Sequence, residues 1–344
     1  MITATAAFGS LSTTALAQNE VKDDFKYTDE QFADIQMLRY KVEGFEKLTL
    51  KEKTFIYYLQ EAALQGRDIL FDQNGRYNLR IRRMLEAVYT DWQGDRKGKF
   101  FTELTTYLKQ VWFSSGIHHH YGCEKFTPGF TADELRAALE QLPANKLPLA
   151  QGQTLSAFCD EIFPVIFDPT VMVMRVNQKD GDDLVLTSAS NYYAPGITQA
   201  EAEEFYTQRK PMADPRPIMM GMNSQVSRDD YGQLTERVWR IGGMYSPALE
   251  RVVENLEKAR PFADTPAQQK VIDLLIEVYR TGDLRTFDDY AIHWLKDTES
   301  LVDFVCYFTE SYGDPLGMKA SWESIVNFKD LAATERTTKL SENA

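Results

Sequence analysis

Apolar side chains recur at intervals of three or four residues between positions 28 and 142, the spacing that gathers them on one face of an α-helix. Two of these stretches also carry a start signal, because Thr49 with Glu52 and Thr131 with Glu134 have the sequence of a capping box. The pattern therefore predicts a mostly helical layer, with helices over 32–39, after Thr49, and over 78–92, 101–112 and 131–139.

The pattern changes in the middle of the chain. Residues 183–187 form a short apolar run, and residues 236–241 alternate between apolar and polar in the two-residue period of a half-buried strand. Glycine and proline residues separate these runs as turns. Between them, 198–206 reads as a capped helix with glutamates at its amino end, where they favour the helix dipole. This part predicts a small mixed or antiparallel sheet flanked by helices.

Helical periodicity returns after Ser246, which reads as an N-cap followed by proline at the first helical position. A second helix is expected from Thr265 and Pro266. Further helices are expected over 287–294, over 301–308 and from Trp322 onward. Residues 332–344 contain no Gly or Pro, so the helical pattern runs to the last residue. Such an ending is typical of a fragment, with 332–344 as the start of a further helical segment. The predicted fold is α+β and largely helical.

The chain has a formal net charge of −13, so its field repels polyanions and we expect no nucleic-acid partner. The charge is explained either by an ordinary solvated acidic surface or by an acidic cleft for a cationic ligand, such as the free amino terminus of a peptide. No segment approaches the roughly 20 consecutive apolar residues that a membrane span needs.

The first residues resemble part of an export signal. Ala15-Leu16-Ala17 has the small-residue pattern of a signal-peptide cleavage site, but no Lys or Arg precedes it. We expect 1–23 to be a leader or a remnant of a signal peptide, 24–331 to form the main lobe, and 332–344 to begin another segment. The chain is periplasmic or exported if the leader acts as a signal, and otherwise cytoplasmic.

The cysteines and histidines do not suggest a metal site. Cys123, Cys159 and Cys306 are scattered and are expected to be buried free thiols. Three consecutive histidines, His118, His119 and His120, cannot all face one metal on a regular element, and none of the chain's histidines is followed by Glu. We expect this triplet to line a cleft or to lie in a loop between helices. Nucleophile-elbow, phosphate-loop and dinucleotide motifs do not occur.

The segment 308–317, Phe-Thr-Glu-Ser-Tyr-Gly-Asp-Pro-Leu-Gly, places Glu310 and Tyr312 at the entry to a Gly-Asp-Pro turn, where the pattern suggests a helix end. A carboxylate and a phenol together bind an ammonium group well. A role for Glu310 in merely capping the turn is the alternative from spacing alone.

This segment resembles the E-S-Y-x-D-P-x-G motif of the dipeptidyl peptidase III family. The stretch 245–259, Asn223-Ser224, and Gly122 with Lys125-Phe126 and Pro128 are similar to further segments of that family. The likeness covers residues 24–344 and is closest to bacterial members, which share the His-His-His-Tyr-Gly string and the sequence of 66–72.

The resemblance implies the substrate-binding lobe of a two-lobed zinc exopeptidase, with a small β-barrel-like sheet among helices. It assigns Glu310 to the free amino group of a peptide and Tyr312 to a hydrogen bond near the scissile bond. The family's zinc motif, H-E-x-x-G-H, is absent from these residues. We therefore expect the amino-terminal part of a dipeptidyl peptidase for short peptides. The full-length member would hold zinc, whereas this chain would bind no metal and be inactive alone. A non-catalytic peptide-binding or interaction protein with the same fold is the alternative.

Overall fold

The computed structural model describes residues 24–209 and 214–343, so the leader expected at 1–23 lies outside the described part. The described residues fall into two compact units, those up to Glu43 and those from Gly44 onward. In the first, strands β1 (Thr28–Phe32) and β2 (Ile35–Leu38) pair as an antiparallel hairpin. The helix predicted over 32–39 is therefore wrong. Ala33 has a left-handed backbone (φ 49°), which reverses the chain between the apolar residues that suggested a helix.

The helical layer predicted for the amino-terminal half of the second unit is confirmed. Both capping boxes are present, with the Thr49 and Thr131 side chains accepting the backbone N–H groups of Glu52 and Glu134. The structure adds α2 and α6, which the pattern did not single out. The helices are α1 (Leu50–Gln65), α2 (Arg67–Asn74), α3 (Asn78–Asp91), α4 (Lys99–Phe113), α5 (Ala132–Leu139) and α6 (Leu155–Phe167).

The middle of the chain contains one confirmed helix and one hairpin. Helix α7 (Gln199–Thr207) is the predicted capped helix, and its cap is a capping box between Thr198 and Glu201. Strands β3 (Ser224–Arg228) and β4 (Leu234–Val238) are antiparallel, so the strand expected over 236–241 begins earlier and ends at Val238. The apolar run 183–187 is a turn rather than a strand, because the Asp183 carboxylate accepts the backbone N–H groups of Val185 and Leu186.

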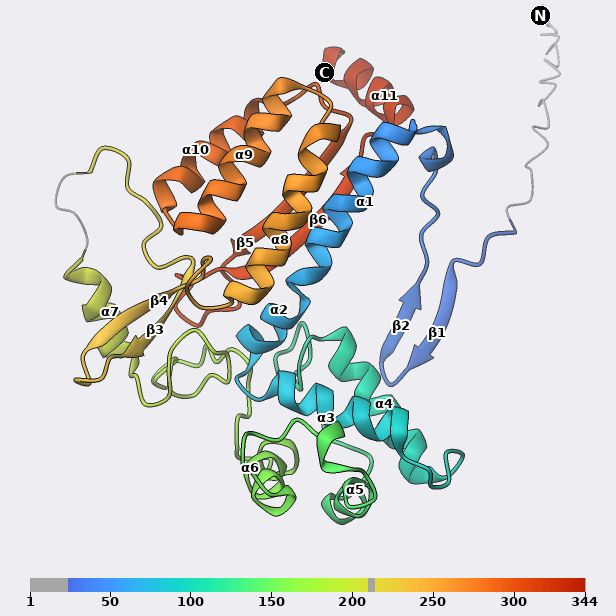
Figure 1. Cartoon of the computed structure of the whole chain (residues 1–344), viewed down its shortest axis with the longest axis vertical. Helices are drawn as coiled ribbons and strands as arrows, with labels where there is room; N and C mark the ends of the chain where they lie inside the picture. The colour runs from blue at the N-terminus through green and yellow to red at the C-terminus, as the bar shows by residue number, and fades with distance from the viewer. Residues whose placement is uncertain (1–23, 210–213, 344) are drawn as a thin grey trace, which may run out of the picture. The chain divides into compact units, whose positions relative to one another are not determined.

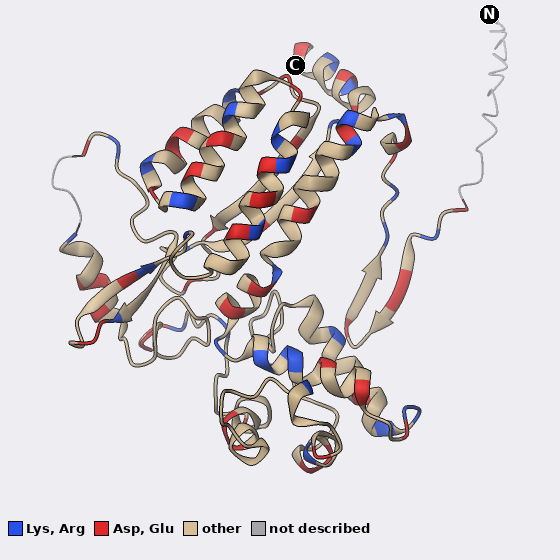
Figure 2. Cartoon of the chain, viewed as in Figure 1, with Lys and Arg blue, Asp and Glu red and all other residues tan. Residues whose placement is uncertain are grey.

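Three helices follow, α8 (Ser246–Ala259), α9 (Pro266–Thr281) and α10 (Leu284–Lys296). Thr265 is the N-cap of α9 as predicted. The N-cap of α8 is Tyr245, with φ 66°, and not Ser246 as predicted. The Ser246 hydroxyl instead accepts the Gly242 N–H and donates to Glu250. In Figure 2, acidic and basic residues interleave along these helices, as on an ordinary solvated surface.

The helix predicted over 301–308 is wrong. This segment is β5 (Val302–Glu310), and it pairs with β6 (Ser321–Phe328), where Trp322 onward was also expected to be helical. Apolar side chains face both sides of β5, so the segment carries no clean two-residue alternation and imitates a buried helix. Its buried residues are Val302, Phe304, Cys306, Tyr307 and Phe308. The remaining helix is α11 (Leu331–Glu342).

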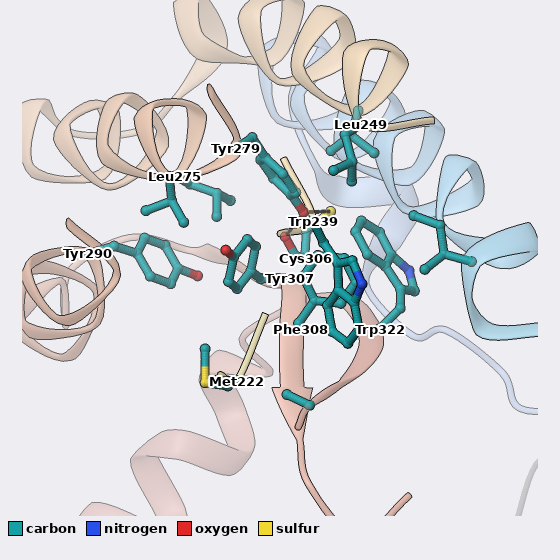
Figure 3. Close-up of a cluster of buried hydrophobic side chains, with 14 of the residues drawn as sticks. Met222, Trp239, Leu249, Leu275, Tyr279, Tyr290, Cys306, Tyr307, Phe308 and Trp322 are labelled. Carbon is teal, nitrogen blue, oxygen red and sulfur yellow. Dashed lines mark hydrogen bonds between the residues drawn. The ribbon is translucent and has the colours of Figure 1, made fainter. Parts of the chain in front are cut away.

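Two hydrophobic cores hold this unit together. One is formed largely by α3 to α6 and the other by α1, α7 to α10, β5 and β6. In Figure 1 the β5–β6 hairpin lies among α1, α8 and α9. Figure 3 shows Trp239 beside Phe308, with ring centroids 4.6 Å apart, and the Tyr279 hydroxyl donating to the Cys306 carbonyl. This packing fixes β5, and with it the position of its last residue, Glu310.

Over the residues described, the strands form three separate two-stranded antiparallel sheets. The fold is thus α+β as predicted, but it is about half helical rather than largely helical, and these strands do not close into the expected barrel-like sheet. Cys159 and Cys306 are buried free thiols, whereas Cys123 is only partly buried, contrary to expectation. No described helix is both long and apolar enough to cross a membrane.

Candidate functional site

A cleft of about 1000 Å³ opens where the carboxyl end of β5 meets the first two helices. Its walls come from the end of α1, from α2, from the connection after α4, and from the start of β6. Helices α1 and α2 join at Gly66, where a Cβ atom would lie 1.7 Å from the Trp322 ring. The glycine thus allows β6 to approach closely. The main polar and aromatic residues of the cleft are Arg67, Asn74, His120, Tyr121, Arg175, Glu310, Tyr312 and Glu323.

Glu310 is the last residue of β5 and pairs with Ser321 across the hairpin. The sequence pattern placed it at the end of a helix, which is incorrect. The pairing register of β5 with β6 shifts between Phe308 and Glu310. Such an irregularity bends the end of a strand and changes the direction of the side chains that follow it. Glu310 is exposed within the cleft, and its carboxylate makes no hydrogen bond or ion pair with any described residue. It is therefore a charged acceptor open to a ligand.

Tyr312 lies two residues further on, in the turn that follows, with 71% of its surface exposed. The structure brings it into the same cleft as Glu310. Partial burial raises the pKa of its phenol, and the Glu310 and Glu323 carboxylates raise it further, while Arg175 opposes them. The hydroxyl is thus neutral near pH 7 and can donate or accept a hydrogen bond.

Three residues of this region were missed from the sequence. Glu323, on β6, accepts a hydrogen bond from the Thr309 hydroxyl at 2.6 Å and adds a second carboxylate to the cleft. The Arg175 guanidinium donates to the His120 carbonyl at 3.0 Å and thereby holds the histidine loop. The side chain of buried Gln73 donates to the Ala320 carbonyl and accepts the Trp322 N–H. These two hydrogen bonds satisfy backbone groups at the start of β6 that have no partner strand on that side among the described residues.

The histidine triplet lies in the connection between α4 and α5, as predicted, and His120 lines the cleft. His118 is buried, with its Nε2 atom 2.7 Å from the Met172 carbonyl. Burial lowers the pKa of His118 to about 4, so the ring is neutral near pH 7. The His119 Nδ1 atom accepts the backbone N–H groups of Tyr121 and Gly122. His118 thus has a partner in the segment after α6, and His119 has partners within the histidine loop itself.

The described residues do not form a binding site for a metal ion. Within 24–209 and 214–343, no three His, Cys, Asp or Glu side chains come together as a metal site. Catalytic zinc needs three protein ligands and an open position. The described residues therefore do not supply a zinc centre.

The turn after Tyr312 ends at Lys319, whose side chain is fully buried. Its ammonium donates to the Tyr206 hydroxyl at 2.6 Å, to the Gly221 carbonyl at 3.0 Å and to the Ser224 hydroxyl at 3.3 Å. Burial lowers its pKa to about 8, although the Glu236 and Asp314 carboxylates oppose this shift.

The contribution of Lys319 to the free energy of unfolding is expected to rise between pH 8 and pH 10. In this range the unfolded chain keeps the Lys319 proton that the native protein has released, so raising the pH favours the native state. The gain is about 2 kcal/mol by pH 9.5, at 1.4 kcal/mol for each pKa unit. Groups whose pKa burial raises, such as Cys306 and Tyr307, act in the opposite direction over part of the same range. Urea unfolding of the unsubstituted chain and of Lys319→Met at pH 7.5 and 9.5 isolates the lysine, because the other groups are common to both. The stability of the unsubstituted chain relative to the variant should increase with pH, and an unchanged difference would contradict this assignment.

Comparison with known proteins supports a single family. Residues 174–344 match the family described as "Peptidase family M49". Over 339 residues the chain is 30% identical to human "Dipeptidyl peptidase 3", a match that covers 88% of this chain and 45% of the relative. It is 23% identical over 330 residues to the protein of that name from Dictyostelium discoideum, with coverage of 88% and 45%. The chain thus spans about 45% of the length of these curated relatives.

Two solved structures share the fold. "Structure of DPP III from Caldithrix abyssi" matches with a TM-score of 0.57 and 18% identity, over 86% of this chain and 43% of that one. "Structure of dipeptidyl-peptidase III from Corallococcus sp. strain EGB" gives a TM-score of 0.56 and 15% identity, over 88% and 44%.

Proposed function

Because this chain belongs to the dipeptidyl peptidase III family, peptidase family M49, we propose that its cleft binds the amino-terminal end of a short peptide. In this proposal the chain is the amino-terminal, substrate-binding part of a zinc-dependent peptidase that releases dipeptides. The zinc belongs to the full-length family member, and the residues described here would not hold it.

The observation that carries the proposal is the unpaired carboxylate of Glu310. A peptide's terminal ammonium is a cation with several N–H donors, and charge-assisted hydrogen bonds to a carboxylate are about twice as strong as neutral ones. Glu323 adds negative charge to the same cleft. The cleft also contains the guanidinium groups of Arg67 and Arg175, so the proposal depends on the unpaired Glu310 carboxylate and not on a net negative charge of the cleft.

Tyr312 has a different role in the proposal. Its neutral hydroxyl can donate to a carbonyl of the bound peptide while Glu310 holds the ammonium. Since only Ser311 separates the two residues, they would form hydrogen bonds with neighbouring groups of one extended peptide. These residues bind and orient the peptide. The water-activating step needs a zinc ion, for which the described residues supply no set of ligands.

Peptide binding tests the proposal without any hydrolysis. In isothermal titration calorimetry, tetra-alanine with a free amino terminus is expected to bind roughly tenfold more tightly than N-acetyl tetra-alanine, a difference of about 1.4 kcal/mol. Glu310→Gln should remove this preference because the amide is neutral. Glu277→Gln makes the same charge change on α9, at an exposed residue outside the cleft, and serves as the matched control. Equal affinity for the two peptides in the unsubstituted chain would refute the proposed function.

A further inference from the structure

We propose that Asp314 is the positioning residue of this cleft, acting through the backbone of the β5–β6 turn to hold Glu310 and Tyr312 where a peptide meets them. The inference rests on the proposed function and adds a residue to it that does not touch the peptide. Asp314 does not line the cleft, so any effect on binding must pass through the turn.

The turn is organised around the Asp314 carboxylate, which is only 2% exposed. Its Oδ2 atom accepts the backbone N–H groups of Met318 at 2.8 Å and Lys319 at 2.9 Å, and its Oδ1 atom accepts that of Leu316 at 3.2 Å. The Tyr193 hydroxyl also donates to Oδ2, at 3.1 Å. A buried carboxylate satisfied by four donors is strongly fixed, because leaving any of these groups unpaired in the interior is costly.

The backbone of the same residue closes the segment that contains Tyr312. The Asp314 N–H donates to the Ser311 carbonyl at 3.1 Å, and the Asp314 carbonyl accepts the Gly317 N–H at 3.0 Å. Gly313 lies against the Tyr192 hydroxyl, where a Cβ atom would come within 2.9 Å of that oxygen. The turn therefore packs against Tyr192 through Gly313 and is hydrogen-bonded to Tyr193 through Asp314.

The positions of the Glu310 and Tyr312 side chains depend on Asp314, because these two side chains make few contacts of their own. The Glu310 carboxylate has no partner among the residues described, and Tyr312 is 71% exposed. Their direction is thus set by the backbone on either side. On the amino-terminal side β5 supplies that support, and on the carboxyl-terminal side Asp314 supplies it.

Asp314→Asn is the direct test. The amide replaces one oxygen by an N–H₂ group that faces the backbone N–H groups, so the turn loses acceptors without a change in side-chain size. Glu310→Gln is then compared in both backgrounds by titration with free tetra-alanine at a temperature where all the variants are folded by circular dichroism. Glu310→Gln should weaken binding roughly tenfold in the unsubstituted chain, by the argument above. In the Asp314→Asn background it should weaken binding less than about twofold, because a misplaced carboxylate no longer meets the ammonium.

Asp183→Asn is the matched control. Asp183 likewise gathers backbone N–H groups, those of Val185, Leu186 and Gln199, but it does not line the cleft. A general loss of stability would affect this control and Asp314→Asn alike, whereas loss of the Glu310 effect is expected for Asp314→Asn alone. If Asp314→Asn does not fold, Tyr193→Phe removes one of the four donors and should reduce the Glu310 effect about two- to threefold.

The outcomes separate the two proposals. If Glu310→Gln has no effect in the unsubstituted chain, the proposed function fails. If it weakens binding tenfold in the unsubstituted chain and equally in the folded Asp314→Asn variant, the positioning role is overturned while the proposed function stands. An undiminished effect in Tyr193→Phe overturns the positioning role in the same way when Asp314→Asn is unfolded.

Discussion

In a full-length protein that carries this chain, Glu310→Gln is expected to lower kcat/KM for short peptides by about two orders of magnitude. Removing one partner of a hydrogen-bonded charge pair from a closed site typically costs 2–5 kcal/mol. At about 1.4 kcal/mol for each tenfold change in rate, the lower part of that range corresponds to roughly a hundredfold. The loss should exceed the tenfold effect on binding to this chain alone, because the isolated cleft is open to water and water screens the pair.

Two controls accompany this measurement. Peptides with a blocked amino terminus should be poor substrates of the unsubstituted enzyme and nearly indifferent to Glu310→Gln. The melting temperature should be unchanged, since the Glu310 carboxylate makes no hydrogen bond to the Ser311–Gly313 segment that it was alternatively expected to cap. A lower melting temperature with unchanged kcat/KM for both kinds of peptide would make Glu310 a turn residue.

The 344-residue chain by itself is expected to release no dipeptide from an arginyl-arginyl-naphthylamide substrate, even with added zinc or cobalt. Hydrolysis in this family is expected to need a zinc ion, and the described residues bring no three metal-binding side chains together. The His118 Nε2 atom already contacts the Met172 carbonyl, which lies in the segment after α6. Zinc retained after a chelator wash and dialysis should accordingly fall well below one equivalent.

Metal-dependent turnover in proportion to the protein, abolished by Glu310→Ala, would contradict this expectation. So would one equivalent of tightly held zinc. The same assay bears on the alternative of a non-catalytic peptide-binding protein. If the protein isolated from its natural source binds peptides through Glu310 but cleaves none, that alternative is favoured over a peptidase.

Helix starts were predictable from the sequence because they depend on contacts within one turn. Thr49 and Thr131 were identified as helix starts from a glutamate three residues later, and both are observed as N-caps. The choice between helix and strand failed where a segment is buried on both sides. Residues 301–308 carry apolar side chains on both faces of β5, so neither period dominates, and only pairing with β6 determines the strand.

The candidate site was predictable in part. Glu310 and Tyr312 were identified by resemblance to a family motif, and the structure places both in one cleft. Arg175 and Gln73 could not have been found, because their partners are distant in sequence: Gln73 contacts the start of β6 more than 240 residues away. Asp314 belongs to the same motif, but its role follows only from the turn it organises.

A crystal structure of this chain with tetra-alanine tests the central claim most directly. We expect the peptide ammonium to lie about 2.7–3.0 Å from a carboxylate oxygen of Glu310, the usual length of a charge-assisted hydrogen bond, with the peptide running past Tyr312. A peptide bound with its amino terminus elsewhere, for instance in the separate pocket beside Asp72 and Arg237, and with Glu310 still free, would contradict it.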